Sequence, residues 1–210
     1  MQIDDAKLTM TLKKTAVLRE QLGQMCTGKQ GLELSVMDLH YVVGKVYGLE
    51  IEMREVSFQA VYLRGKVERY QDNRARVLVR SNLTDTEKRL VAVKELCHLA
   101  LDEKDDWSTD GAAMLEAILS DSQGDSIPAT HVLLTPIESE ALALLAAGEL
   151  MYPADFREAD AAKIAAGEMT VSAIALQHEV PPFIVEQALR REAKLKPLRD
   201  NANGELGIAA

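Results

Sequence analysis

The sequence has few features of secreted, disulfide-bonded or membrane-spanning proteins. Its two cysteines, Cys26 and Cys97, are too few for a disulfide framework and fit a reducing compartment better. No window approaches the roughly 20 apolar residues that a membrane-spanning helix needs. The opening residues, MQIDDAKLTM, carry acids where a secretory signal has a basic start and an apolar run. We therefore expect a cytoplasmic protein with no membrane partner.

The sequence also has fewer basic than acidic residues. Lysine and arginine total 24 against 33 aspartates and glutamates, which gives a net charge of -9. That balance argues against a surface that binds DNA or anionic lipid without sequence preference. The 210 residues, 47% of them hydrophobic, are enough for one buried core with a small appendage.

The first quarter of the chain predicts two helices. Apolar residues recur with a helical period over residues 4–25. Ser35 has the position of an N-cap, with Asp38 three residues later, and Gly48 is placed to end the second helix.

The next segment predicts a small sheet. Short runs rich in Val, Ile, Leu and Tyr lie at about residues 51–55, 60–67 and 75–80. We expect these three strands to pair antiparallel, with Asp72 and Asn73 in a hairpin turn between the last two.

The second half of the chain predicts helices. Thr84 and Glu87 form a capping box at the start of one helix, which should end at a solvated acidic loop at 102–106. Thr135 and Pro136 are typical of another helix start, and Pro153 of its end. Further helices are expected at residues 111–120, 155–166, 171–178 and 183–193.

The predicted fold class is therefore α+β, with helices around a small antiparallel sheet and a helical C-terminal region. We expect a helix–sheet–helix domain at residues 1–153 and a helical appendage at 154–196. Residues 197–210 lack periodicity and contain Asn203 and Gly204, so a flexible tail is expected there.

The most informative segment is Lys94-Glu95-Leu96-Cys97-His98. In a His-Glu-x-x-His helix, two imidazoles at i and i+4 hold zinc on one face, and the Glu activates the metal-bound water. Glu95 and His98 match that pattern, whereas Lys94 stands where the first histidine would be.

Two patches of the sequence resemble the ImmA/IrrE-type metallopeptidase family. One is the capped helix that carries Lys94, Glu95 and His98, and the other is Ala-rich sequence over residues 146–153 that ends at Pro153. The sequence from Pro181, Pro-Pro-Phe-Ile-Val-Glu, is similar to the helical segment that follows in that family. The resemblance covers residues 35–190 and implies a zincin-like arrangement.

The resemblance also implies roles for particular residues. Family members hold zinc with both motif histidines and an acid on the alanine-rich helix, and they cleave helix-turn-helix repressors. Here His98 and Glu140 would be metal ligands, and Glu95 the catalytic base. Alignment on Pro153 puts Leu142 at the acid's position, so Glu140 or Glu138 would serve only with a shift along the helix.

Lys94 argues against a working zinc site. An ammonium has no lone pair, and removing its proton at pH 7 costs roughly 4–5 kcal/mol. No cofactor is therefore expected, with zinc only if the site is functional. One hypothesis is that the ammonium pairs with Glu95 or Glu140 and replaces the metal. The alternative is a surface lysine on an ordinary amphipathic helix, with Glu95 also on the surface.

Three functions remain open from the sequence. The preferred one is an impaired family member that binds a protein partner, such as a repressor or an antitoxin. The second is an active zinc endopeptidase that cleaves a helix-turn-helix regulator. The third is a DNA-binding regulator using the C-terminal helices at 155–166 and 171–178 and a basic stripe, although nucleic acid is the less expected partner. The stripe consists of Arg190, Arg191, Lys194, Lys196 and Arg199.

The remaining cysteine and histidines have simpler interpretations. Cys97 is expected to be a small core residue rather than a nucleophile. His40, His131 and His178 fall on different elements, where structural roles are expected.

Overall fold

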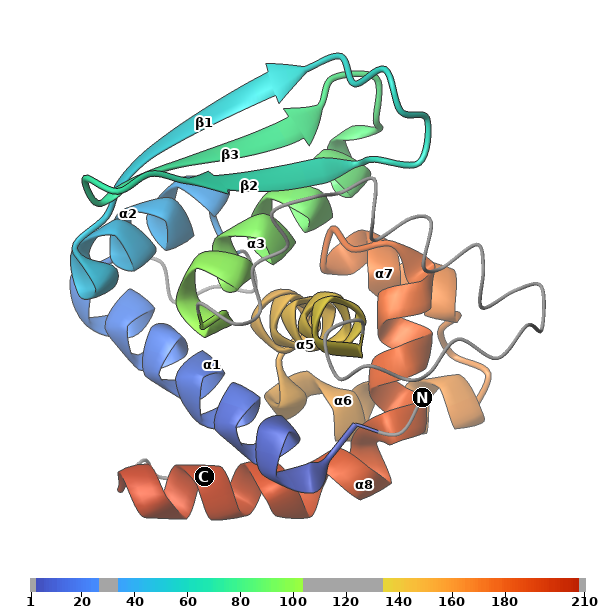
Figure 1. The fold of residues 1–210 in the computed structure, drawn as a ribbon. Coiled ribbons are helices and arrows are strands. Elements are labelled where there is room, and N and C mark those ends of the chain that lie inside the picture. The colour runs from blue at the N-terminus through green and yellow to red at the C-terminus, as the bar shows by residue number, and fades with distance from the viewer. Residues whose placement is uncertain (1–2, 27–33, 104–133, 208–210) are drawn as a thin grey trace, which may run out of the picture.

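The computed structural model describes residues 3–26, 34–103 and 134–207 and shows an α+β fold (Figure 1). The strands are β1 (Glu50–Val56), β2 (Gly65–Arg69) and β3 (Arg74–Arg80). The helices are α1 (Asp5–Met25), α2 (Val36–Tyr47), α3 (Asp85–Leu101), α5 (Leu134–Met151), α6 (Ala154–Ala165), α7 (Val171–Gln177) and α8 (Pro182–Leu206). The predicted helix at 111–120 lies outside the described residues. Among the described helices, none is long and apolar enough to cross a membrane.

The sheet is mixed, so the prediction of three antiparallel strands is wrong in part. Its order is β1-β3-β2, with β3 antiparallel to β2 and parallel to β1. The predicted hairpin turn between β2 and β3 is confirmed, with Asn73 at a φ of 59°. Residues 57–64, part of which were expected in the second strand, connect β1 to β2 past the end of β3. This order puts the most apolar strand in the centre, where Val77 and Val79 are buried.

Local capping signals define the helices of the first half, and those of the second and third helices were predicted. The side chain of Asp4 caps α1, and that of Ser35 accepts from the backbone N–H of Asp38 at the start of α2. Gly48, with a φ of 64°, ends α2 in the left-handed conformation that glycine favours. Thr84 and Glu87 form the predicted capping box of α3.

Helix α3 lies at the centre of the molecule. The sheet covers one side of it and α5 packs on another, while α2 lies beside it under the sheet (Figure 1). Val93, Leu96 and Cys97 are fully buried in this core, as are Ala143 and Ala147 of α5. The described part of α5 begins at Leu134, one residue before the predicted cap at Thr135, and the helix ends before Pro153 as predicted.

The C-terminal helix is longer than predicted. Helix α8 continues through Pro197 to Leu206, so the expectation of an irregular tail is wrong for residues 197–206. Leu195, Arg199 and Ala202 are buried on both sides of the proline, and this packing holds the helix together. The predicted domain boundary after residue 153 stays a prediction.

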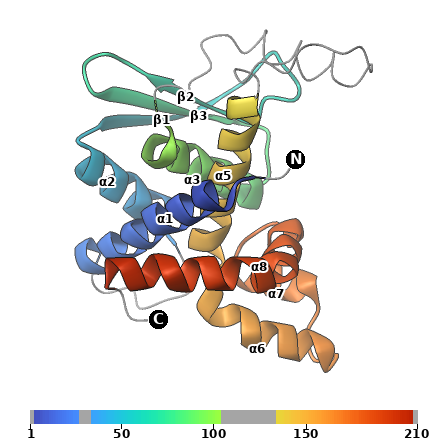
Figure 2. The same cartoon turned by 60° about the horizontal axis from the view of Figure 1, so that its bottom comes forward.

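Helices α1 and α8 lie side by side and run in the same direction (Figure 2). An ion pair of 3.0 Å joins Asp5 to Lys194 near one end, and Lys13 pairs with Glu205 near the other.

Candidate functional site

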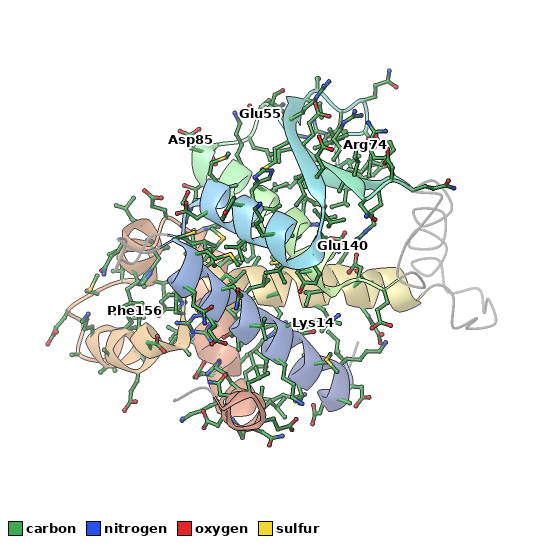
Figure 3. The ribbon with its side chains drawn as sticks, turned by 90° about the vertical axis from the view of Figure 1, so that its left-hand side faces the viewer. Lys14, Glu55, Arg74, Asp85, Glu140 and Phe156 are labelled. Carbon is green, nitrogen blue, oxygen red and sulfur yellow. The ribbon has the colours of Figure 1, made fainter. Side chains whose placement is uncertain are left out.

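Four charged side chains meet where α3 packs on α5. Lys94, Glu95 and His98 come from α3, and Glu140 comes from the side of α5 that faces the sheet (Figure 3). Lys94 Nζ lies 2.6 Å from Glu140 Oε2 and 2.9 Å from Glu95 Oε1. His98 Nε2 lies 3.2 Å from Glu140 Oε1. The residues singled out in the sequence therefore form one cluster, with the lysine ammonium between two carboxylates.

The burial of this cluster excludes the surface interpretation of the motif. Glu95 is only 3% exposed and His98 only 6%. The amine of Lys94 contacts both carboxylates, and its side chain is 17% exposed. Glu140 is half-exposed and closes the cluster on the solvent side.

Two residues that the sequence did not single out hold His98 in place. His98 Nδ1 lies 2.9 Å from Asp102 Oδ2. Ser139 Oγ donates to Asp102 Oδ1 at 2.8 Å and lies 3.2 Å from the same imidazole nitrogen. Asp102 was expected in a solvated loop, whereas its side chain is mostly buried. The spacing of four residues between His98 and Asp102 was the signal that could have identified it.

This arrangement also orients the second nitrogen of the His98 ring, Nε2. With Nδ1 held by Asp102 and Ser139, Nε2 is turned toward Glu140. A carboxylate on the remote nitrogen of a histidine is typical of metal sites, where it fixes the ring and the tautomer. His98 is therefore presented as a metal ligand would be.

Strand β2 lies directly against the cluster. A Cβ atom added to Gly65 would come within 2.5 Å of both Glu95 Oε1 and Val91 Cγ1. Arg69 of the same strand donates to the backbone carbonyl of His98 at 2.7 Å. Gly65 is thus the residue that allows the sheet to approach α3.

The contacts within the cluster set the charge states of its members. Burial lowers the pKa of Lys94, but the carboxylates of Glu95 and Glu140 outweigh it and raise that pKa overall. Partial burial raises the pKa of Glu140, but His98 and Lys94 together hold it at about 2. Burial lowers the pKa of His98, yet Asp102 and Glu140 raise it to about 9. At neutral pH the cluster therefore holds two cations, on Lys94 and His98.

Glu95 is held differently from Glu140. Burial raises its pKa, and Lys94 and His98 only partly offset that effect. Its Oε1 atom is buried and, among the described residues, has no hydrogen-bond partner in spite of its ion pair with Lys94. The same is true of His98 Nε2, although it lies within ion-pair distance of Glu140.

Zinc does not fit the donor set at this site. The described residues contain no group of three or more His, Cys, Asp or Glu side chains arranged to hold a metal. His98 and Glu140 are brought together as predicted, but catalytic zinc sites have three protein ligands. The third position is taken by an ammonium, which repels a divalent cation and has no lone pair to donate.

Other reactive groups near the cluster are not arranged for catalysis. Ser139 and Asp102 both contact the Nδ1 side of His98, whereas a catalytic serine and its aspartate lie on opposite ring nitrogens. Cys97 is fully buried, and burial raises the pKa of its thiol far above its usual value. Cys97 is a core residue, as predicted.

The remaining histidines lie elsewhere. His40 Nε2 is 2.9 Å from the carbonyl oxygen of Ile51. His178 is buried against the rings of Tyr152 and Phe156. His131 is outside the described residues.

The C-terminal helices differ from the expected DNA-binding arrangement. Helix α7 packs on α8, across a turn in which Glu179 has a φ of 52°, so the helix pair is not the one predicted at 155–166 and 171–178. Arg199 is buried and ion-paired with Glu149 and Glu192, which removes it from the basic stripe. DNA binding stays a prediction.

The described residues thus combine an α+β fold with a buried Lys–Glu–His–Glu cluster at the junction of α3, α5 and β2. Neither a protein-family model nor a curated protein matches this chain.

Proposed function

We propose that this chain is a metallopeptidase-like regulatory protein of the ImmA/IrrE type that binds a partner protein without cleaving it. The observation that carries the proposal is the Lys94 ammonium, 2.6 Å from Glu140 and 2.9 Å from Glu95, in a cluster that also contains His98. The cluster has the residue types and helix placement of a zinc-protease site, with a fixed cation at the ligand position.

Hydrolysis is not supported by this cluster. Peptide cleavage of this type needs a metal-bound water and a carboxylate free to take its proton. Glu95 instead pairs with Lys94 and is packed beneath Gly65. The runner-up function, an active zinc endopeptidase with Glu95 as base, would require Lys94 to leave both carboxylates.

Strand β2 supports binding of an extended partner segment. It is an edge strand of the described sheet and lies beside the cluster. The pairing register, with Tyr70 donating to Arg74 and Arg80 to Arg64, turns the backbone N–H of Val67 away from β3. A peptide strand added along this edge would gain main-chain hydrogen bonds next to Lys94 and Glu140.

The partner class follows from the resemblance. The family acts on helix-turn-helix repressors, so a repressor or an antitoxin encoded beside this chain is the proposed partner.

Proline substitutions on the two sheet edges test the proposal. Val67→Pro blocks addition at β2 without removing a hydrogen bond to β3. Glu55→Pro is the matched control, because the register of the parallel pair also turns the N–H of Glu55 away from β3, but at the opposite edge. The probe is the adjacent repressor or antitoxin, with affinity measured by calorimetry and cleavage by intact-mass spectrometry.

The expected result is an intact partner that binds wild type and Glu55→Pro, with at least tenfold weaker binding to Val67→Pro. Equal binding by both proline variants would exclude the β2 edge. Cleavage of the partner, with stoichiometric zinc in the purified protein, would establish the endopeptidase instead.

A further inference from the structure

We infer that Lys94 takes the place of a divalent cation and links α3 to α5 through its ammonium. We also infer that the metal site is latent, so that one substitution at position 94 restores it. The inference concerns the same cluster as the proposed function but does not depend on partner binding. The inference can therefore fail while partner binding is confirmed, and partner binding can fail while the inference is confirmed.

The ammonium of Lys94 lies where a metal ion would be needed. Lys94 contacts Glu95 on its own helix and Glu140 on α5, so one cation links carboxylates from two helices. Two carboxylates brought together in a partly buried site repel each other and need a counter-charge. A metal ion supplies this charge in a zinc site, and here the side chain of Lys94 supplies it.

The residues that would orient a metal ligand are intact. Asp102 and Ser139 hold Nδ1 of His98, as a carboxylate holds the remote nitrogen of a metal-bound histidine. Nε2 of His98 and Oε1 of Glu95 are both buried atoms of the cluster, the first 3.2 Å from Glu140 and the second 2.9 Å from the Lys94 ammonium. They are the two atoms that would respectively bind a metal and accept from its water in a site of this class.

The helical spacing of residues 94 and 98 suits a pair of metal ligands. Residues 94 and 98 are one turn apart on the same face of α3, and Glu140 contacts both side chains. An imidazole at position 94 would complete a set of three ligands with His98 and Glu140, the number typical of catalytic zinc.

Thermal unfolding tests whether the Lys94 ammonium links α3 to α5. Lys94→Met should lower the melting temperature by about 5–15 °C, because it removes the ammonium that pairs with the buried Glu95 and links it to Glu140. Lys94→Arg retains a cation and should lose less than half as much. Adding Glu140→Gln to Lys94→Met should cost less than the sum of the two single losses, because the residues interact.

Metal binding tests the latent site. Lys94→His should bind one equivalent of zinc or cobalt(II) by calorimetry, and bound cobalt should show the visible absorption of a tetrahedral site. Zinc should also raise the melting temperature of this variant. Wild type should bind neither metal, and zinc should leave its melting temperature unchanged. The double variant Lys94→His, Glu140→Gln is the matched control and should bind at least tenfold more weakly.

Two results would overturn the inference. An unchanged melting temperature in Lys94→Met would show that the ammonium is not a structural cation. Failure of folded Lys94→His to bind zinc or cobalt, or equal zinc binding by wild type, would show that the lysine does not occupy a metal locus.

Discussion

Gly65 and Glu95 lie so close together that position 65 has no room for a side chain. A Cβ atom there would stand 2.5 Å from Glu95 Oε1, 2.9 Å from Glu95 Cγ and 2.5 Å from Val91 Cγ1. Two of these three contacts are with carbon atoms near the helix backbone, so rotation of the Glu95 carboxylate alone would not relieve them. The distance between β2 and the charged cluster therefore depends on this glycine.

Gly65→Ala should destabilise the protein by about 1–3 kcal/mol, the usual cost of overpacking a core. Gly204→Ala is the control, because nothing lies within 4 Å of the added methyl group and the residue is inside α8. The control should stabilise the protein by about 0.5–1 kcal/mol. Urea unfolding measures both changes, and a neutral effect of Gly65→Ala would mean that β2 is not held against α3.

The raised pKa of His98 predicts a loss of stability at alkaline pH. The folded-state pKa is about 9 against an ordinary value of 6.5, so folding favours the protonated ring. This contribution, about 3 kcal/mol, is complete below pH 6.5 and disappears as the pH rises to 9. Unfolding free energies across that range should show it. His98→Gln should remove most of the slope, and parallel curves for the two proteins would contradict the assignment.

His178 predicts the opposite behaviour in acid. Burial lowers its pKa, and Asp160 at 3.6 Å offsets this only in part. The unfolded chain therefore binds a proton at His178 before the folded chain does, and stability should fall as the pH drops below 6.5. His178→Phe keeps an aromatic ring beside Tyr152 and should flatten the curve between pH 6.5 and 5. An equally steep curve in the variant would place the acid sensitivity elsewhere.

Arg157 should be among the most sensitive positions in the chain. It is 1% exposed and contacts Glu149 at 2.9 Å and Glu192 at 2.8 Å. Arg157→Leu leaves these carboxylates with Arg199 as their one remaining cation in the described cluster, at an expected cost of about 3–5 kcal/mol.

An exposed ion pair provides the comparison for Arg157. Lys196 and Asp200 are 3.0 Å apart with both side chains largely in solvent. Lys196→Leu should change the unfolding free energy by less than about 1 kcal/mol. Similar losses for the two variants in urea unfolding would show that burial does not decide the cost.

The two cysteines should differ in reactivity. Cys97 is fully buried and burial raises the pKa of its thiol, whereas Cys26 is partly exposed. Under native conditions a thiol reagent should label Cys26 at least a hundredfold faster than Cys97. Mass mapping of the labelled protein measures this ratio, and fast labelling of Cys97 would mean that α3 opens readily.

Local signals in the sequence predicted much of the fold. The caps at Ser35, Gly48, Thr84 and Glu87 were identified correctly because each depends on residues within one turn. Strand order was not predictable in this way. Residues 57–64 connect β1 to β2 across the end of β3, and this connection leaves the central position of the sheet to β3. The lack of periodicity after residue 196 was misleading, because burial of Leu195 and Ala202 continues α8 through Pro197 to Leu206.

The site was predictable to a similar extent. Helical spacing placed Lys94, Glu95 and His98 together, and the structure shows Lys94 contacting both carboxylates named beforehand, Glu95 and Glu140. Ser139 and Asp102 were missed because their roles depend on how closely α3 and α5 approach, which no local pattern encodes.

The parallel packing of α1 on α8 joins segments that are far apart in the sequence, with 192 positions between Lys13 and its partner Glu205. Leu8 and Leu12 of α1 are buried, yet the helix on one side of it is complete only at Leu206. During synthesis α1 must therefore wait until α8 has been made before this contact can form. Closing so long a loop slows folding, and a nascent chain would expose the apolar face of α1 until then.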